Sequence, residues 1–184
     1  MRFGDQVKEV TPMQESDVLE FCLSMENSGI TVWIDGGWGV DALLGEQTRP
    51  HKDLDIAIQG KDVALLREEL RAKGYHDIRL EIARPHNFVL GDGNGHEVDV
   101  HVIVLDAQGN GIYGPPGNGE MYPAASLNGM GTIAGHPVKC ISPAWAIKFH
   151  SGYRLQEKDF KDVSALCEKF GVKLPEEYTK GFGT

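Results

Sequence analysis

The chain has 184 residues, which is enough for one domain with a sizeable hydrophobic core. Its formal net charge of −9 argues against a nucleic-acid partner, because a surface that grips a phosphate backbone is normally basic, whereas an acidic cleft concentrates small cations. No apolar run is long enough to span a membrane, and the polar start of the chain predicts no secretory signal. Three distant cysteines, Cys22, Cys140 and Cys167, predict reduced thiols in a cytoplasmic protein.

A glycine pair lies between two elements predicted early in the chain. Apolar periodicity and turn residues predict a helix, a short strand and a second helix at residues 15–28, 31–34 and 38–44. Gly36 and Gly37 separate the strand from the second helix, and a glycine turn lets a ligand approach the free N–H groups at a helix start. Most Gly-Gly pairs are simple turns, so this candidate phosphate site needs support from residues further along the chain.

Two aspartates one residue apart give the strongest chemical signal. Residues 53–58 alternate between polar and apolar, so Asp53 and Asp55 share one face of a predicted strand. Adjacent carboxylates repel each other unless a cation lies between them, and hard oxygen ligands suit Mg²⁺. An isolated pair of this kind is more often a solvated strand edge, but the glycine turn upstream favours the metal. Arg49 and His51 lie in a basic loop that either reaches phosphate oxygens or is a solvated turn.

A third carboxylate lies on a later strand. The middle of the chain predicts one helix and three strands, at residues 61–73, 78–82, 87–90 and 97–102, with a hairpin turn before the last. In that last strand Glu97, Asp99 and His101 share one face, so Asp99 can join the metal site if the two aspartate strands are neighbours. Two alternatives stay open for His101: a half-buried structural histidine, or a zinc site with His96 and Asp99, whose spacing is not distinctive.

The last part of the chain predicts a loop, a strand pair and two helices, at residues 106–131, 132–141, 144–152 and 157–170. The helices carry several basic residues, of which Lys148 is our candidate for contacting a triphosphate, although a solvated helix face explains each single lysine better. Four aromatic residues could line a pocket for a second substrate, and core packing explains them equally well: Tyr113, Tyr122, Trp145 and Tyr153.

A longer pattern joins these motifs. It reads Gly-Gly-Trp-x-x-Asp and then Gly-x-x-x-Arg-x-His-x-Asp-x-Asp, and it is carried by Gly36, Gly37, Trp38, Asp41, Gly45, Arg49, His51, Asp53 and Asp55. This pattern resembles the antibiotic nucleotidyltransferases of the polymerase-β superfamily. The chain resembles the small lincosamide nucleotidyltransferases first, also at residues 140–142 and 149–153, and the aminoglycoside 2″-adenylyltransferases second. The motif is specific for the superfamily and much less specific for the acceptor molecule.

The resemblance implies an α+β protein with the polymerase-β-like nucleotidyltransferase fold, in which a mixed sheet has flanking helices and a C-terminal helical part. We expect a single domain over residues 1–184. Within it, residues 1–105 would form the nucleotidyltransferase core and residues 106–184 the acceptor-shaping loops and C-terminal helices. The resemblance also suggests a homodimer.

The implied reaction transfers a nucleoside monophosphate, usually AMP from ATP, to a hydroxyl of a small cationic antibiotic, with a lincosamide first. By the resemblance Asp53 and Asp55 hold two Mg²⁺ ions, and Asp99 is the third carboxylate and general base. We assign to the nucleotide site Gly36, Gly37, Arg49, His51 and Lys148. We assign to the acceptor site Glu97, His101, Tyr113 and Tyr153.

Three other functions are compatible with the same pattern. One is an aminoglycoside 2″-nucleotidyltransferase, and another is a nucleotidyltransferase-like antitoxin that acts on a partner protein. The third is an inactive binding protein of the same fold, against which the complete set of Asp53, Asp55 and Asp99 argues. The sequence leaves open the acceptor, the hydroxyl that is modified and the nucleotide that is preferred.

Overall fold

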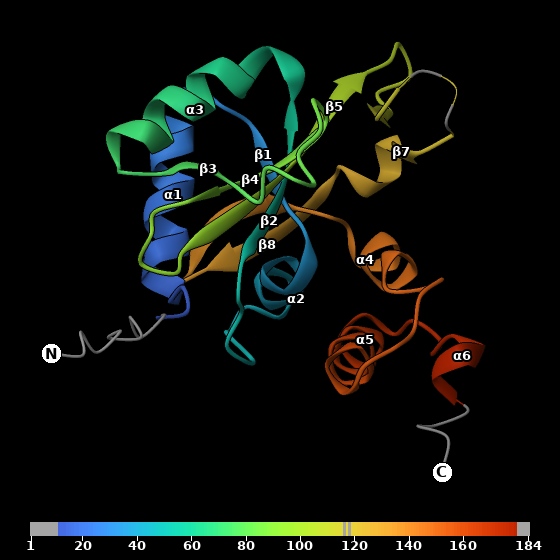
Figure 1. Ribbon diagram of the computed structural model, residues 1–184. Coiled ribbons are helices and arrows are strands. Elements are labelled where there is room, and N and C mark those ends of the chain that lie inside the picture. Colours follow the sequence, from blue (N-terminus) through green and yellow to red (C-terminus); the bar gives the residue numbers. More distant parts are fainter. Residues whose placement is uncertain (1–10, 116, 118, 180–184) are drawn as a thin grey trace, which may run out of the picture.

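The computed structural model describes residues 11–115, 117 and 119–179 as a mixed β-sheet flanked by helices (Figure 1). This arrangement is α+β, as the sequence predicts. The first ten residues, from which we expect no secretory signal, lie outside the described part of the chain. In the part that is described, every helix is too short or too polar to cross a membrane.

Most of the helices predicted from the sequence are present in the structure. They are α1 (Glu15–Asn27), α2 (Gly36–Leu44), α3 (Val63–Ala72), α4 (Pro143–Phe149), α5 (Glu157–Phe170) and α6 (Glu176–Thr179), with 3-10 turns at Gly60–Asp62 and Ala124–Ser126. Helix α5 has the predicted bounds and ends at Gly171, which takes a left-handed conformation with φ of 65°. Helix α2 starts two residues before its predicted start, so the glycine pair belongs to its first turn.

The strands form one sheet in the order β3-β4-β5-β2-β1-β9-β8, and β6 and β7 extend from β5. Their bounds are β1 (Val32–Ile34), β2 (Leu54–Gln59), β3 (His76–Ile78), β4 (Asn87–Gly91), β5 (Glu97–Leu105), β6 (Gly111–Tyr113), β7 (Met121–Tyr122), β8 (Gly129–Ile133) and β9 (His136–Cys140). Strands β2 and β5 are parallel neighbours, and Asp55 lies opposite Asp99. The structure therefore meets the condition on which a shared carboxylate site depends.

The two faces of the sheet differ in character. On one face Val32 and Ile34 of β1 border a small cavity with Met25 of α1, and the Arg67 guanidinium of α3 lies 3.9 Å from the Phe88 ring. Helices α1 and α3 therefore cover this apolar face (Figure 1). Alternation along the strands places the aspartates of β2 and β5 on the other face, toward α2 and the C-terminal helices.

The structure corrects two predicted elements. The strand predicted at residues 78–82 ends at Ile78, because Arg79 has a positive φ of 54° and starts a turn. Residues 106–131, predicted as loop, contain β6, β7 and the start of β8. Gly111 is required in β6, since a Cβ there would lie 2.6 Å from the Ile103 side chain. The glycines that suggested a loop thus allow tight strand packing.

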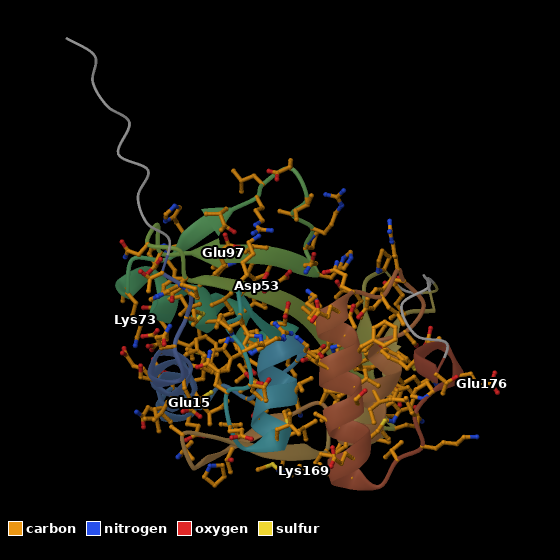
Figure 2. The ribbon with its side chains drawn as sticks, turned by 90° about the horizontal axis from the view of Figure 1, so that it is seen from below. Glu15, Asp53, Lys73, Glu97, Lys169 and Glu176 are labelled. Carbon is orange, nitrogen blue, oxygen red and sulfur yellow. The ribbon has the colours of Figure 1, made fainter. Side chains whose placement is uncertain are left out.

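Helix α2 is held on both sides. A Cβ at Gly131 of β8 would overlap the carbonyl oxygen of Ala42, so β8 and α2 meet backbone to backbone. On the other side α5 runs next to α2, and Lys169 Nζ donates to the Leu44 carbonyl at 2.7 Å (Figure 2). The start of α2, where the glycine pair lies, therefore has a fixed position relative to the aspartate strands.

Candidate functional site

The glycine pair places the start of α2 against the first aspartate strand. Asp35 is the N-cap residue, and its carboxylate accepts a hydrogen bond from the Gly36 N–H at 2.8 Å. Gly36 has a positive φ of 56°, and a Cβ there would overlap the Asp55 carboxylate. A Cβ at Gly37 would overlap the His51 ring. Glycine at both positions therefore lets the helix start lie directly against Asp55 and His51.

Four carboxylates surround the same point of the sheet. Burial and, after it, the charges of Asp53, Asp35 and Asp99 together raise the pKa of Asp55 to about 8. Such an excess of hard oxygen donors fits a divalent cation. Within the described residues, no three His, Cys, Asp or Glu side chains already form a metal-ligand cluster. The carboxylates are thus near one another, but their side chains are not arranged as the ligands of one metal ion.

The basic loop before β2 is fixed by one ion pair and one buried hydrogen bond. The Arg49 guanidinium donates two hydrogen bonds to Asp162 of α5, at 2.7 and 3.2 Å. His51 is buried and hydrogen-bonded to the buried Asp41 of α2, which also accepts from the Thr48 hydroxyl at 2.6 Å. These contacts hold the loop against both helices. They also show that Arg49 and His51 have structural partners besides any ligand.

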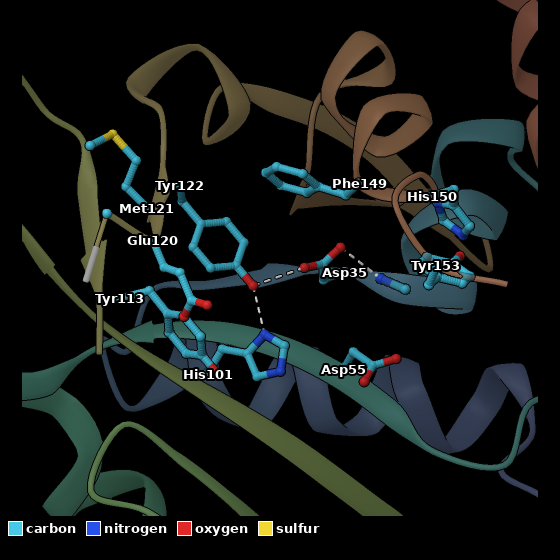
Figure 3. Close-up of a pocket in the computed structure, with 12 residues that line it drawn as sticks. Asp35, Asp55, His101, Tyr113, Glu120, Met121, Tyr122, Phe149, His150 and Tyr153 are labelled. Carbon is cyan, nitrogen blue, oxygen red and sulfur yellow. Dashed lines mark hydrogen bonds between the residues drawn. The ribbon is translucent and has the colours of Figure 1, made fainter. Parts of the chain in front are cut away.

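Two pockets meet at Asp55. The polar pocket has a volume of about 340 Å³ and is lined by Gly36, Gly37, Arg49, Pro50, His51, Lys52, Asp53, Asp55, His150, Tyr153, Lys158 and Asp159. The aromatic pocket has a volume of about 590 Å³ and is lined by Asp35, Gly36, Asp55, His101, Tyr113, Gly119, Glu120, Met121, Tyr122, Phe149, His150 and Tyr153 (Figure 3). Gly36, Asp55, His150 and Tyr153 border both, so a group in one pocket lies next to a group in the other.

Most of the predicted site residues lie at these pockets. The polar pocket is lined by six of the residues assigned to metal or nucleotide, namely Gly36, Gly37, Arg49, His51, Asp53 and Asp55. The aromatic pocket is lined by three of the residues assigned to the acceptor, namely His101, Tyr113 and Tyr153. Asp99 lies beside Asp55 without lining either pocket, and its Oδ1 accepts a hydrogen bond from Asn87 Nδ2 at 2.8 Å.

Besides Asp99, two assigned residues lie outside both pockets. Lys148 is exposed, and its Nζ lies 4.4 Å from the centre of the Trp145 ring, which is on its own helix. Glu97 is paired with Arg79 from the turn after β3. Both residues have partners within the protein, and neither faces the junction at Asp55.

Three residues at the pockets were not among the assigned site residues, although Lys158 is one of the basic residues of the C-terminal helices and Tyr122 is one of the aromatic candidates. Asp35 could have been found, because aspartate before a glycine-initiated helix is a strong N-cap signal. Lys158, on α5, lines the polar pocket instead of Lys148. Tyr122 is buried, and its hydroxyl contacts Asp35 and His101. No local pattern identifies the last two, because their position depends on how distant segments pack.

Comparison with known proteins finds relatives along most of the chain. The family model of the aminoglycoside-2″-adenylyltransferases matches residues 17–166. A lincosamide resistance protein of Staphylococcus haemolyticus is 31% identical over 142 residues, which are 77% of this chain and 86% of that protein. A 2″-aminoglycoside nucleotidyltransferase of Escherichia coli is 42% identical over a shorter stretch of 36 residues, which is 20% of each chain.

Two solved structures are similar over nearly the whole chain. A lincosamide antibiotic adenylyltransferase with bound lincomycin has a TM-score of 0.75 and 27% identity, and the match covers 89% of this chain and 100% of that one. ANT(2″)-Ia in complex with adenylyl-2″-tobramycin has a TM-score of 0.68 and 21% identity, with 91% and 93% covered. The second similarity shows the fold alone. Together they confirm the predicted nucleotidyltransferase fold.

Proposed function

From the premise that this chain belongs to the aminoglycoside-2″-adenylyltransferase family and is a nucleotidyltransferase, we propose that it transfers AMP from ATP to a hydroxyl of a lincosamide. The observation that carries the proposal is the meeting of two unlike pockets at Asp55. One is polar and carries cations, and the other is lined by aromatic rings. A transfer reaction needs two substrates whose reacting atoms meet between such sites.

The polar pocket suits the triphosphate. Lys52, Lys158 and Arg49 line it, and Gly36 and Gly37 place the positive end of the α2 dipole at its wall. The carboxylates Asp53, Asp55 and Asp99 would hold Mg²⁺, as their crowding and the raised pKa of Asp55 support. When bound, Mg²⁺ neutralises charge on the phosphates. In this proposal Lys158 takes the part that the sequence assigned to Lys148.

The proposed chemistry is a single displacement. A hydroxyl oxygen of the acceptor attacks the α-phosphorus, the bond to the bridging oxygen breaks, and pyrophosphate leaves. The Asp99 carboxylate, which lies opposite Asp55 on the neighbouring parallel strand, takes the hydroxyl proton. Positioning and charge stabilisation supply most of the acceleration, so no nucleotide becomes bonded to the enzyme.

The aromatic pocket supports a lincosamide over an aminoglycoside. Its walls include the rings of Tyr113, Tyr122, Phe149 and Tyr153. An aminoglycoside carries many amines and little apolar surface, so it would need more carboxylates than the few that face this pocket. A lincosamide joins a polyhydroxylated sugar to an apolar portion with one amine. Glu120, at the pocket wall, is a suitable partner for that amine.

The two parts of the chain would then have different tasks. We propose that residues 1–105 supply the carboxylates and the glycine turn, and that residues 106–184 shape the acceptor side. Tyr113, Glu120 and Phe149 of the aromatic pocket come from the second part. The parts share one sheet, because β9 pairs with β1, so the chain acts as one domain. A homodimer remains part of this proposal.

The decisive experiment incubates the protein with ATP, Mg²⁺ and a panel of lincosamides and aminoglycosides. Pyrophosphate release and the mass of each acceptor are measured, with Asp55→Asn as the inactive control. We expect a lincosamide to gain one AMP. Modification of an aminoglycoside alone would assign the alternative acceptor class. If only proteins in a mixture gained mass, the antitoxin-like function would replace this proposal.

A further inference from the structure

The segment of residues 150–153, between α4 and α5, borders both pockets. It supplies His150 and Tyr153, which line the polar and the aromatic pocket alike. The other two residues with this property, Gly36 and Asp55, belong to the helix start and the aspartate strand. Figure 3 shows the side chains of His150 and Tyr153 on the same side of the aromatic pocket. A movement of this segment would therefore change the surroundings of both substrates at once.

The segment is not held by regular secondary structure. Residues 151–156 form an irregular connection, and Gly152 turns the chain with a positive φ of 83°. The Tyr153 side chain is 49% exposed, so burial alone does not determine where its ring points. Segments of this kind open locally unless hydrogen bonds from other elements hold them. The position of residues 150–153 therefore depends on contacts with other parts of the chain.

Two contacts from the C-terminal helices hold the segment. The Tyr178 hydroxyl of α6 donates a hydrogen bond to the His150 carbonyl. The Tyr153 hydroxyl donates to Asp159 Oδ1 of α5 at 3.1 Å. Asp159 is buried, and its other oxygen accepts from the Gln156 N–H at 2.7 Å in the capping box of α5. The segment is thus tied to α6 at one end and to the start of α5 at the other.

Tyr178 has a fixed position of its own. It is buried, and its ring packs against Phe160 of α5 with a centroid distance of 5.1 Å. Burial and the charges of Asp159 and Glu177 raise the pKa of Tyr178 to about 12, so the hydroxyl keeps the proton that it donates. Helix α6 has only four residues and lies beside α5 (Figure 1). A helix this short is not stable alone, so packing of Tyr178 holds it in place.

We propose that Tyr178 is a positioning residue for both substrates, because its hydroxyl holds residues 150–153 at the border of the two pockets through the His150 carbonyl. This inference rests on the proposed function, since it concerns the same two substrates. Tyr178 lines neither pocket, so it acts through the segment and not on a substrate. A residue 28 positions after His150 thus completes the acceptor side of the site.

Kinetics test the effect on the substrates. Tyr178→Phe keeps the ring against Phe160 and removes only the hydroxyl. We expect KM for ATP and KM for the acceptor each to rise about fivefold, because binding must then order a segment that the wild type holds in place. A merely structural role gives a different result: fewer folded molecules lower the apparent kcat and leave both KM values unchanged. Thr179→Val is the matched control, since this exposed hydroxyl donates only within α6, to the Glu176 carbonyl.

The segment can also be observed without any substrate. The backbone N–H of His150 donates to the Ala146 carbonyl at 3.3 Å, so its hydrogen exchange reports whether this end of the segment opens. We expect exchange at His150 to become about tenfold faster in Tyr178→Phe, as after loss of one hydrogen bond, and to stay unchanged in Thr179→Val. Equal exchange in the wild type and Tyr178→Phe would overturn the proposal.

The outcomes separate this proposal from the proposed function. If the wild type transferred AMP to no acceptor, the proposed function would fail, and exchange at His150 would still decide whether Tyr178 holds the segment. If transfer were established but Tyr178→Phe lowered kcat alone, or raised KM for one substrate only, the positioning role would be wrong. Should Tyr178→Phe not fold, Tyr153→Phe carries the test, because it releases the other end of the segment from Asp159 and should raise both KM values.

Discussion

The walls of the two pockets at Asp55 are stabilised by different kinds of interaction. The wall of the polar pocket is fixed by the ion pair of Arg49 with Asp162 and by the buried hydrogen bond of His51 with Asp41, which join the loop to α5 and α2. The wall of the aromatic pocket is fixed by ring packing and by short strands in a glycine-rich segment. Ion pairs fix charges in place, whereas packed rings offer apolar surface.

The two pockets differ in their charged side chains. The polar pocket combines three cations with three carboxylates, namely Arg49, Lys52 and Lys158 with Asp53, Asp55 and Asp159. Apart from histidine, the aromatic pocket has only carboxylates among its charged lining residues, namely Asp35, Asp55 and Glu120. Cations that could face an anionic group therefore lie in the polar pocket alone, and the aromatic pocket favours a cationic one.

The largest effect should come from the residue that both pockets share. Asp55→Asn should lower kcat/KM by about 10³-fold, the scale on which removal of one group that stabilises transition-state charge acts. The fold should persist, because the change removes one of several mutually repelling charges. Steady-state kinetics and thermal unfolding measure both, with the exposed Glu81→Gln as control. Turnover near the wild-type value would exclude Asp55 from the reaction.

The second-largest effect should be on the pH dependence of the free energy of unfolding when no metal is bound. The pKa of Asp55 is raised to about 8, so between about pH 4 and pH 8 the folded state holds a proton that the unfolded state has lost. The free energy of unfolding should therefore fall as the pH rises through this window. Melting temperatures in EDTA should be higher at about pH 5 than at about pH 8. Asp55→Asn should flatten the dependence, and an equal slope in that variant would contradict the prediction.

A smaller effect compares two lysines on neighbouring helices. Lys158→Gln should raise KM for ATP about tenfold, or about 1.4 kcal/mol, because Lys158 lines the polar pocket. Lys148→Gln should change it by less than about twofold, since Lys148 stacks on Trp145 outside both pockets. Both variants remove one positive charge, so each is the control for the other. The reverse order would restore the sequence assignment of Lys148.

The smallest effect should appear on the aromatic side. Tyr113→Leu keeps an apolar side chain but removes a ring that packs against His101 and Tyr122. We expect KM for the acceptor to rise about threefold, in keeping with the modest value of one aromatic contact, and KM for ATP to stay constant. If KM for ATP rose instead, the division of the two substrates between the pockets would be wrong.

The sequence predicts the carboxylate side of the site well because its signals are local. Alternation within residues 53–58 and 97–102 assigns three aspartates to one face of two strands. The glycine turn and the helix after it are predicted by residues that are adjacent in the chain. The sequence does not predict that β2 and β5 are parallel neighbours, because periodicity does not encode strand order. The shared carboxylate site therefore depended on this pairing as a condition.

The sequence predicts the partners of these groups poorly because they are distant. Arg49 pairs with Asp162, which lies 113 positions away, and Tyr122 reaches Asp35 across 87 positions. The choice between Lys148 and Lys158 depends on how α4 and α5 are turned toward the pocket. Glu97 lies in β5 as its alternation with apolar neighbours predicts, but its carboxylate forms an ion pair with Arg79. Tertiary packing, not pattern, decides each of these cases.

The backbone contact between Gly131 of β8 and Ala42 of α2 has a consequence for variation of this enzyme. Any side chain at position 131 would act as a wedge, tilting the helix whose first turn borders Asp55. We therefore expect catalytic efficiency to depend on Gly131, which lines neither pocket. Mutants that lose or change resistance activity should be sought under the helix as well as around the bound drug.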